Sequence, residues 1–308
     1  MRNIKIIGYG GYVPDNKVIF EGGTRPRCKD GETQLDMAVK ACNEALEKAH
    51  INIKDIDCIV STSAVGVQPI PCTAALIHER IARGLDIPAF DINSTCTSFV
   101  TALDIMSYLI QDGRYNRVLI VASDIASKGL NEDEKESYEL FSDAACAFII
   151  EKSYDKEQGV IASMQKTWSE GAHKTEIRGG LSNLHASCYK EENKGDYLFS
   201  MQGLSIVSIL AKRLPKMFNE FMEKYDLKME DIDVVIPHQA SKALPLIMKR
   251  LGIKNYVDMV KEYGNQVSVS IPYMLYLLMK SQKVKEKDKV LLLGTAAGLT
   301  TNILLIRI

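Results

Sequence analysis

The sequence predicts an α/β protein in which two related halves pack together in the layer order α/β/α/β/α. Helical patterns at 33–49 and 203–225 alternate with apolar runs that are too short for helices. This alternation is typical of a mostly parallel sheet covered by helices on both faces. At 308 residues, the chain is long enough to bury a sizeable core.

An internal repeat supports the two halves. A helix end, a short polar turn and an apolar strand at 46–60 recur at 222–236. A second apolar strand at 117–123 recurs at 289–295, at a similar offset. Self-similarity at one spacing indicates a duplicated unit.

The repeat suggests a division into three parts. We expect an N-terminal half at 1–152, a polar connection at 153–200 and a C-terminal half at 201–308. The connection carries the only tryptophan, Trp168, and a run of Lys, Glu and Asn residues. Its composition fits either a solvated excursion or a cap over a substrate channel.

Composition excludes several function classes. The 38 Lys and Arg residues balance 39 Asp and Glu residues, so no basic surface for nucleic acid or anionic lipid is predicted. No apolar run is long enough for a signal peptide or a membrane span. The seven cysteines are dispersed without metal-ligand or redox-pair spacing. We therefore expect a cytoplasmic protein without a metal site.

One cysteine has a setting that suggests catalysis. Cys96 stands in Asn-Ser-Thr-Cys-Thr-Ser-Phe, between an apolar strand at 87–93 and an apolar helix at 97–110. At a helix N-terminus, free N–H groups and the helix dipole favour a thiolate. Most cysteines in such chains are inert core residues, and the other six are expected to be so.

Two further residues complete a candidate site. In the run Val-Val-Ile-Pro-His that starts at residue 234, His238 stands at the end of a buried strand, where parallel α/β sheets place their ligands. Asn265 follows a glycine in a turn before an apolar helix. Taken singly, each has an ordinary structural explanation, as a core histidine and a turn residue.

Together the three motifs resemble the Cys–His–Asn triad of 3-oxoacyl-[acyl-carrier-protein] synthase III, a family with the thiolase fold. The motifs are Ser-Thr-Cys-Thr-Ser-Phe around Cys96, Pro-His-Gln-Ala-Ser around His238 and Gly-Asn-Gln-Val-Ser-Val-Ser-Ile-Pro around Asn265. Leu-Phe-Ser-Asp-Ala-Ala at 140–145, Met-Gln-Gly at 201–203 and Gly-Leu-Thr at 298–300 also resemble family segments in the same order.

The resemblance implies a decarboxylative Claisen condensation through an acyl-Cys intermediate. Cys96 would carry the acyl group, and its N–H together with that of Gly298 would form the oxyanion hole. His238 and Asn265 would donate hydrogen bonds to the thioester oxygen of a malonyl unit as it loses carbon dioxide. The expected substrate-binding residues are Ile70, Phe141, Met201 and Lys242.

The resemblance also implies partners. Acyl carrier protein or coenzyme A would deliver the thioesters, no further cofactor is expected, and the chain would form a homodimer. The gate around Ile70 would then reach into the pocket of the other subunit. Nucleic acid and membranes are not expected partners.

The chain departs from the family near the substrate. The family segment that grips coenzyme A, with its Trp, is deleted between residues 18 and 33, and Ile70 stands where the family often has Phe. Ala243 replaces an Arg that usually follows the His, with Lys242 beside it. We therefore expect a substrate outside housekeeping fatty-acid synthesis, in polyketide or fatty-acid-derived metabolism, with a carrier protein as the preferred donor.

Four alternatives stay open from sequence. The first is a thiolase-fold acyltransferase that forms an ester or an amide, and the second is a condensation without decarboxylation. The third is a non-catalytic dimer partner, against which the intact triad counts. A papain-like hydrolase is least favoured, because its nucleophile would lie nearer the start of the chain and the repeat would be unexplained.

Overall fold

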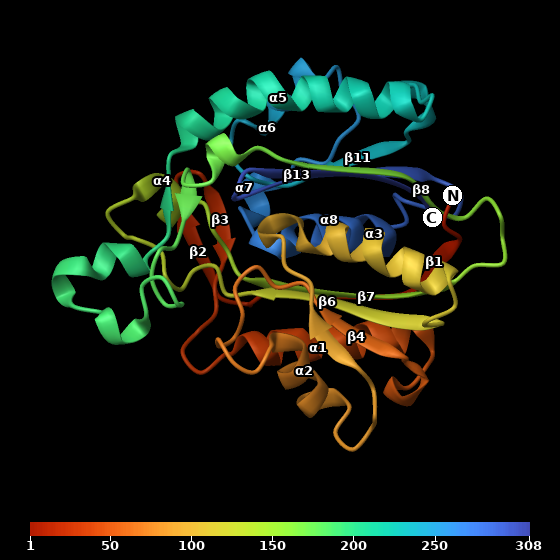
Figure 1. Cartoon of the computed structure of the whole chain (residues 1–308), viewed down its shortest axis with the longest axis horizontal. Coiled ribbons are helices and arrows are strands. Elements are labelled where there is room, and N and C mark those ends of the chain that lie inside the picture. The colour runs from red at the N-terminus through yellow and green to blue at the C-terminus, as the bar shows by residue number, and fades with distance from the viewer.

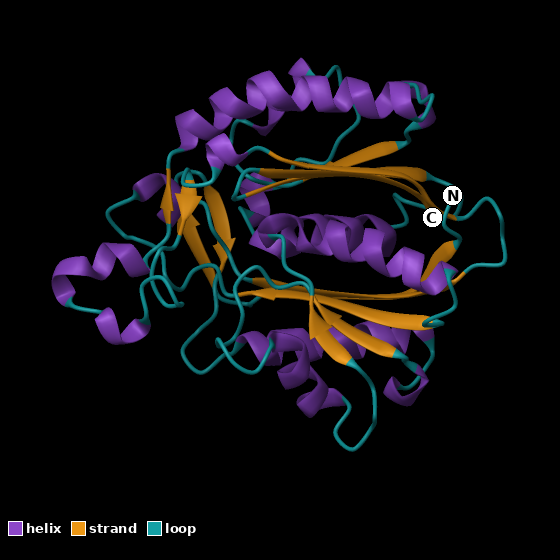
Figure 2. Cartoon of the chain, in the orientation of Figure 1, coloured by secondary structure: helices purple, strands orange, loops and turns teal.

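The computed structural model describes residues 1–308 and has the five predicted layers (Figure 1; Figure 2). The first sheet has the strand order β1-β7-β6-β4-β5, and the second has the order β11-β12-β13-β8. The strands of the first sheet are β1 (Ile4–Tyr12), β4 (Cys58–Ser61), β5 (Ala89–Asp91), β6 (Arg117–Asp124) and β7 (Ala144–Lys152). Those of the second are β8 (Gly159–Thr167), β11 (Val234–Pro237), β12 (Lys289–Ala296) and β13 (Thr300–Arg307).

Helices fill the space between the sheets and cover their outer faces. Helices α3 (Ser98–Gln111) and α8 (Ser270–Lys280) form the middle layer. Helices α1 (Gln34–Ala49) and α2 (Thr73–Ile81) cover the outer face of the first sheet, and α5 (Gly203–Lys224) and α6 (Leu244–Arg250) cover the second (Figure 1). The middle helices are apolar nearly all round because each faces a sheet on both sides.

The prediction of mostly parallel sheets is wrong. The pairs β4–β5, β4–β6 and β11–β12 are parallel, whereas β1–β7, β6–β7, β12–β13 and β8–β13 are antiparallel. For β12 and β13 the physical reason is the length of their connection, a three-residue turn at 297–299, which permits only antiparallel neighbours.

The duplication is visible in equivalent contacts. In each half a long helix is followed by a 3₁₀ turn and a strand: η1 (Ile53–Asp55) precedes β4, and η6 (Met229–Asp231) precedes β11. The carboxylate of Asp57 accepts the N–H of Arg117 at 2.9 Å, and that of Asp233 accepts the N–H of Lys289 at 2.7 Å. Equivalent aspartates therefore join equivalent pairs of parallel strands in the two halves.

The largest core joins the halves. It contains 29 buried residues from the middle layer and the two sheet faces that sandwich it, including Phe99, Leu103 and Met106 of α3 and Leu275 of α8. Each of these four side chains is no more than 1 % exposed. Helices α3 and α8 consequently pack against strands of both sheets.

The segment 153–200, expected as a connection, also contributes to the second sheet, because β8 lies within it and pairs with β13. Its later part forms the strand pair β9 (Thr175–Glu176) and β10 (Ser200–Met201). Between them, the turns η4 (Ala186–Cys188) and η5 (Glu191–Tyr197) project from the body (Figure 1).

The remaining elements are short. They are the hairpin β2 (Lys17–Phe20) and β3 (Gly23–Pro26), helices α4 (Lys135–Tyr138) and α7 (Val260–Tyr263), and the 3₁₀ turns η2 (Thr95–Thr97), η3 (Ser169–Gly171) and η7 (Val267–Val269). None of the helices combines the length and the apolar character that crossing a membrane requires.

Candidate active site

Cys96 lies in the turn η2, between β5 and α3, and small polar side chains hold this turn. The N–H of Ser94 donates to Ser98 Oγ at 2.9 Å, and the N–H of Thr95 donates to Asn93 Oδ1 at 2.7 Å. Thr95 has a φ of +53°, an uncommon conformation for a β-branched residue. The predicted break between strand and helix is therefore a tightly bonded elbow that presents Cys96.

The thiol of Cys96 is protonated at neutral pH. Burial, with the nearby charge of Asp124, raises the pKa of Cys96 to about 12, although the N–H groups of Ala297 and Cys96 lower it. The expectation that the start of the helix stabilises a thiolate is wrong for the free protein. Loss of water around the sulfur outweighs the field of the helix end.

His238 directly follows β11 and is 4 % exposed. Its backbone N–H donates to the carbonyl of Leu293 in β12 at 2.9 Å, so the backbone pairing of β11 with β12 extends to His238. Burial lowers the pKa of His238 to about 4. The imidazole is neutral at pH 7 and offers one N–H donor, and its buried Nδ1 has no hydrogen-bond partner.

The side chain of Gln239 joins Pro237, which precedes His238, to the segment 257–259, a role that the sequence did not reveal. Its side-chain amide donates to the carbonyls of Pro237 at 2.9 Å and Val257 at 3.0 Å, and its Oε1 accepts the N–H of Met259 at 2.7 Å. Its side chain is 1 % exposed. The available signal was an amide residue next to a histidine at a strand end.

Asn265 is fixed by its own backbone and by a short turn. Its N–H donates to the carbonyl of Leu140 at 2.9 Å, and its carbonyl accepts the N–H of Ser142 at 3.0 Å. Its Oδ1 accepts the N–H of Val267 at 2.9 Å, which sets the orientation of the carboxamide. The Nδ2 donors therefore remain for a ligand.

The structure gathers these three residues around η2. The turn of Cys96 contacts η7, which follows Asn265, and also β12, whose Leu293 binds the backbone of His238. The contact with β12 is close: a Cβ on Gly294 would lie 2.5 Å from Thr97 Cγ2. Cys96 comes from the first half of the chain, and His238 and Asn265 come from the second.

A cavity of about 630 Å³ opens beside His238. Of the four residues expected to bind substrate, Met201 and Lys242 line this cavity, and Leu140 lines it in place of Phe141. Lys242 packs against the β2–β3 turn, since a Cβ on Gly22 would lie 2.9 Å from its Nζ. Apolar side chains of α5 and α6 form one wall: Leu204, Ile206, Val207, Leu210, Leu214, Leu244, Ile247 and Met248.

The other predicted residues lie elsewhere. The ring of Phe141 packs edge-on against Phe199, with ring centres 4.8 Å apart, and its backbone pairs with Asn265. Ile70 is 85 % exposed and does not line the cavity of its own chain. Gly298 has a φ of +121°, which only glycine adopts readily, at the turn that also carries Ala297.

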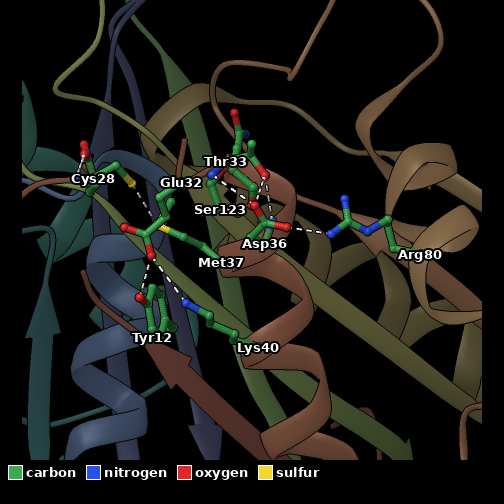
Figure 3. Close-up of polar contacts among 11 residues, drawn as sticks. Tyr12, Cys28, Glu32, Thr33, Asp36, Met37, Lys40, Arg80 and Ser123 are labelled. Carbon is green, nitrogen blue, oxygen red and sulfur yellow. Dashed lines mark hydrogen bonds and ion pairs between the residues drawn. The ribbon is translucent and has the colours of Figure 1, made fainter. Parts of the chain in front are cut away.

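A second hollow lies near the start of α1. Figure 3 shows the hydrogen bonds and ion pairs between charged and polar side chains there. Glu32 accepts hydrogen bonds from Tyr12 and Lys40, and Asp36 pairs with Arg80. These side chains satisfy one another and join α1 to β1 and α2. No cluster of three or more His, Cys, Asp or Glu residues is placed to hold a metal ion.

Comparison with known proteins identifies the family. The family model described as 3-Oxoacyl-[acyl-carrier-protein (ACP)] synthase III matches residues 90–168, and its C-terminal counterpart matches residues 222–308. The first match contains Cys96, and the second contains His238 and Asn265. The triad proposed from sequence therefore lies within the matched regions.

Similar proteins extend over the whole chain. A beta-ketoacyl-[acyl-carrier-protein] synthase III of Clostridium perfringens is 30 % identical, with 100 % of both chains covered. The crystal structure of 3-oxoacyl-[acyl-carrier-protein] synthase III from Aquifex aeolicus has a TM-score of 0.86 at 26 % identity, over 99 % of this chain and 100 % of that one. The priming beta-ketosynthase of the R1128 polyketide pathway, 22 % identical with a TM-score of 0.88 over 100 % of this chain and 96 % of that one, shares the fold. The chain thus has the thiolase fold and belongs to the 3-oxoacyl-[acyl-carrier-protein] synthase III family.

Proposed function

We propose that the chain condenses acyl thioesters through an acyl-Cys96 intermediate. The observation that carries the proposal is a neutral, buried His238 and an oriented Asn265 beside the turn that presents Cys96. Two neutral donors suit a reaction in which negative charge appears on a thioester oxygen only in the transition state.

In the first half-reaction, Cys96 Sγ attacks the carbonyl carbon of the acyl thioester. A new thioester bond forms, the bond to the carrier sulfur breaks, and the carrier thiol leaves with the proton that Cys96 gives up. The backbone N–H groups of Cys96 and Gly298 stabilise the oxyanion of the tetrahedral intermediate. Because the thiol is protonated at rest, this proton must move during the attack.

In the second half-reaction, a malonyl thioester loses carbon dioxide. The electron pair of the broken carbon–carbon bond enters an enolate, whose oxygen accepts hydrogen bonds from His238 and Asn265. The carbanion then attacks the acyl carbon on Cys96, a carbon–carbon bond forms, and the Cys96 sulfur leaves and takes a proton. Both donors remain in place at neutral pH, because the imidazole does not titrate there.

The carrier arm of the substrate would occupy the cavity beside His238. Met201 and Lys242 line it, and Lys242 offers a cation for a phosphate or carbonyl group of the arm. Phe141 supports Asn265 through its backbone. We propose a carrier protein as the preferred donor, with coenzyme A thioesters as alternatives, and an acyl group from polyketide or fatty-acid-derived metabolism.

We further propose that the protein acts as a homodimer. The edge strand β5 and the exposed side chain of Ile70 are available to a second copy, and Ile70 would then approach the pocket of the partner subunit. All seven cysteines are free thiols, which suits a reducing cytoplasmic compartment.

The proposal is tested in two stages. The protein is first incubated with a panel of acyl thioesters on coenzyme A and on carrier protein, and the intact mass is measured. A malonyl thioester is then added and the released product is identified. A 3-oxoacyl product supports the proposal, whereas an ester or amide formed with an added alcohol or amine, and no 3-oxoacyl product, would replace it with acyl transfer.

A further inference from the structure

The buried carboxylate of Asp124 has no place in the chemistry described above. Asp124 ends β6, and its side chain is 2 % exposed. It accepts the N–H groups of Ala64 at 3.0 Å and Val65 at 3.1 Å, and both the N–H and the hydroxyl of Ser268. Four donors from two separate segments therefore meet on one side chain.

The first segment leads to the nucleophile. The residue that gives its N–H to Asp124, Ala64, also accepts the side-chain amide of Asn93 at 3.0 Å. Asn93 in turn accepts the N–H of Thr95, which precedes Cys96. A chain of three hydrogen bonds thus connects Asp124 to the turn that presents the thiol.

The second segment leads to the two donors. Ser268 belongs to η7, and the first residue of that turn, Val267, binds the carboxamide of Asn265. Two residues after Ser268, the hydroxyl of Ser270 accepts the N–H of Gln239, next to His238. A side chain that holds Ser268 in place therefore also helps to position His238 and Asn265, the two donors that would stabilise the enolate.

We propose that Asp124 is a positioning residue, which holds the Cys96 turn and the turn at 265–270 at a fixed separation for condensation. The inference rests on the proposed function. A carboxylate is required because three of the four partners are backbone N–H groups, which only donate: an amide at this place would set its NH₂ group against at least one of them, and that bond would be lost. Its proximity to Cys96 is supported by the effect of its charge on the thiol.

The decisive variants are Asp124→Asn and Ser268→Ala. We expect each to lower kcat for condensation tenfold or more, with the KM for the malonyl thioester changed less than twofold, because the reacting groups are displaced and the cavity is intact. Ser268→Thr retains a hydroxyl and should restore most of the rate. Asp57→Asn is the matched control, since Asp57 accepts the N–H groups of Asn116 and Arg117 at the other end of the same strands.

A second measurement does not depend on the proposed function. Alkylation of Cys96 by iodoacetamide, followed against pH without substrate, should show a lower inflection in Asp124→Asn than in the wild type. Asp124 is the charged side chain that acts on Cys96, and His238 is neutral. A wild-type alkylation profile and a wild-type kcat in Asp124→Asn would overturn the inference, as would an equal loss of kcat in Asp57→Asn. An absent condensation in the wild type, with a shifted profile in the variant, would instead count against the proposed function.

Discussion

Ser270 Oγ accepts the backbone N–H of Gln239 at 2.8 Å, so the first residue of α8 holds the residue that follows His238. The start of this helix therefore contacts two loops at once, because the turn before it, η7, binds the side chain of Asn265 through the N–H of Val267. The residues that the second half contributes to the site are thus both connected to the start of α8. Substitutions near the start of α8 should displace His238 and Asn265 and lower kcat more than they weaken substrate binding.

Gln239→Leu should destabilise the protein by about 2 kcal/mol or more, because the N–H of Met259 and the carbonyls of Pro237 and Val257 would lose their partner. Chemical denaturation measures this change. Gln239→Glu is a useful comparison, since its carboxylate retains the acceptor for the N–H of Met259 and loses the donors to the carbonyls of Pro237 and Val257. An unchanged free energy of unfolding in Gln239→Leu would mean that water replaces the amide.

The two half-reactions should separate by mutation. Cys96→Ala should abolish the single acyl adduct seen by intact-protein mass spectrometry. His238→Ala and Asn265→Ala should retain the adduct and lose condensation by about 10²- to 10³-fold, the usual effect of removing one donor to a developing oxyanion. An adduct of equal yield on Cys96→Ala would move the nucleophile to another cysteine.

His238 should make stability depend on pH. Its pKa is lowered from 6.5 in the unfolded chain to about 4 by burial, so the unfolded state binds the extra proton between these values. Stability is therefore lost as pH falls, by about 2 kcal/mol between pH 7 and pH 5. Asp124 has the opposite effect on stability as pH falls, because burial raises its pKa from 3.8 to about 6 and the folded state therefore binds the extra proton between these values.

The contribution of the histidine is isolated by comparing the wild type with His238→Gln in urea at both pH values. The difference in unfolding free energy between the two proteins should shift by about 2 kcal/mol between pH 7 and pH 5, with the wild type losing more. A constant difference would show that water reaches the imidazole and relieves the desolvation.

Gly298→Ala should impair acylation. The φ of +121° is strained for any residue with a Cβ, at a cost of about 1–3 kcal/mol, although a Cβ there would meet only Thr300, with Oγ1 at 3.6 Å and the backbone N at 3.9 Å. The turn should relax and move its N–H groups away from Cys96, which lowers the acylation rate. Gly113→Ala, at a φ of +82° with open space around it, is the control for strain alone.

Ile70→Phe should shift the preferred acyl group toward shorter chains if the dimer places this residue at the partner's pocket. Each methylene excluded from an apolar site loses about 0.8 kcal/mol of binding. Acylation rates across chain lengths measure the shift, and light scattering should report twice the mass of the chain. Identical length profiles for both proteins would remove Ile70 from the pocket.

The sequence predicted what depends on local pattern and on the duplication. The five layers follow from the alternation of apolar runs and helical patterns, and the repeat at 46–60 and 222–236 is reproduced in the paired roles of Asp57 and Asp233. The relative direction of neighbouring strands was not predictable in the same way. The alternation of apolar runs and helical patterns does not show whether two strands are joined by a crossover, which makes them parallel, or by a direct turn, which makes them antiparallel.

The electrostatics of the site also lay beyond the sequence. Cys96 stands near a helix start, as predicted, but the pKa of its thiol is decided by burial and by Asp124, which is 28 positions away in the chain. Asp124 and Gln239 act through contacts with loops from distant parts of the sequence. Nothing in the local composition around them indicates those partners.

The shared core between α3 and α8 has a consequence for inactivation. Because the nucleophile projects from one half and the two donors from the other, any separation of the halves dismantles the reaction centre at the same moment as it exposes that core. A partly melted species that still condenses thioesters is not expected. On heating, the loss of condensation activity and the loss of the circular-dichroism signal should follow the same thermal transition. At each temperature the folded molecules should be fully active and the unfolded molecules inactive.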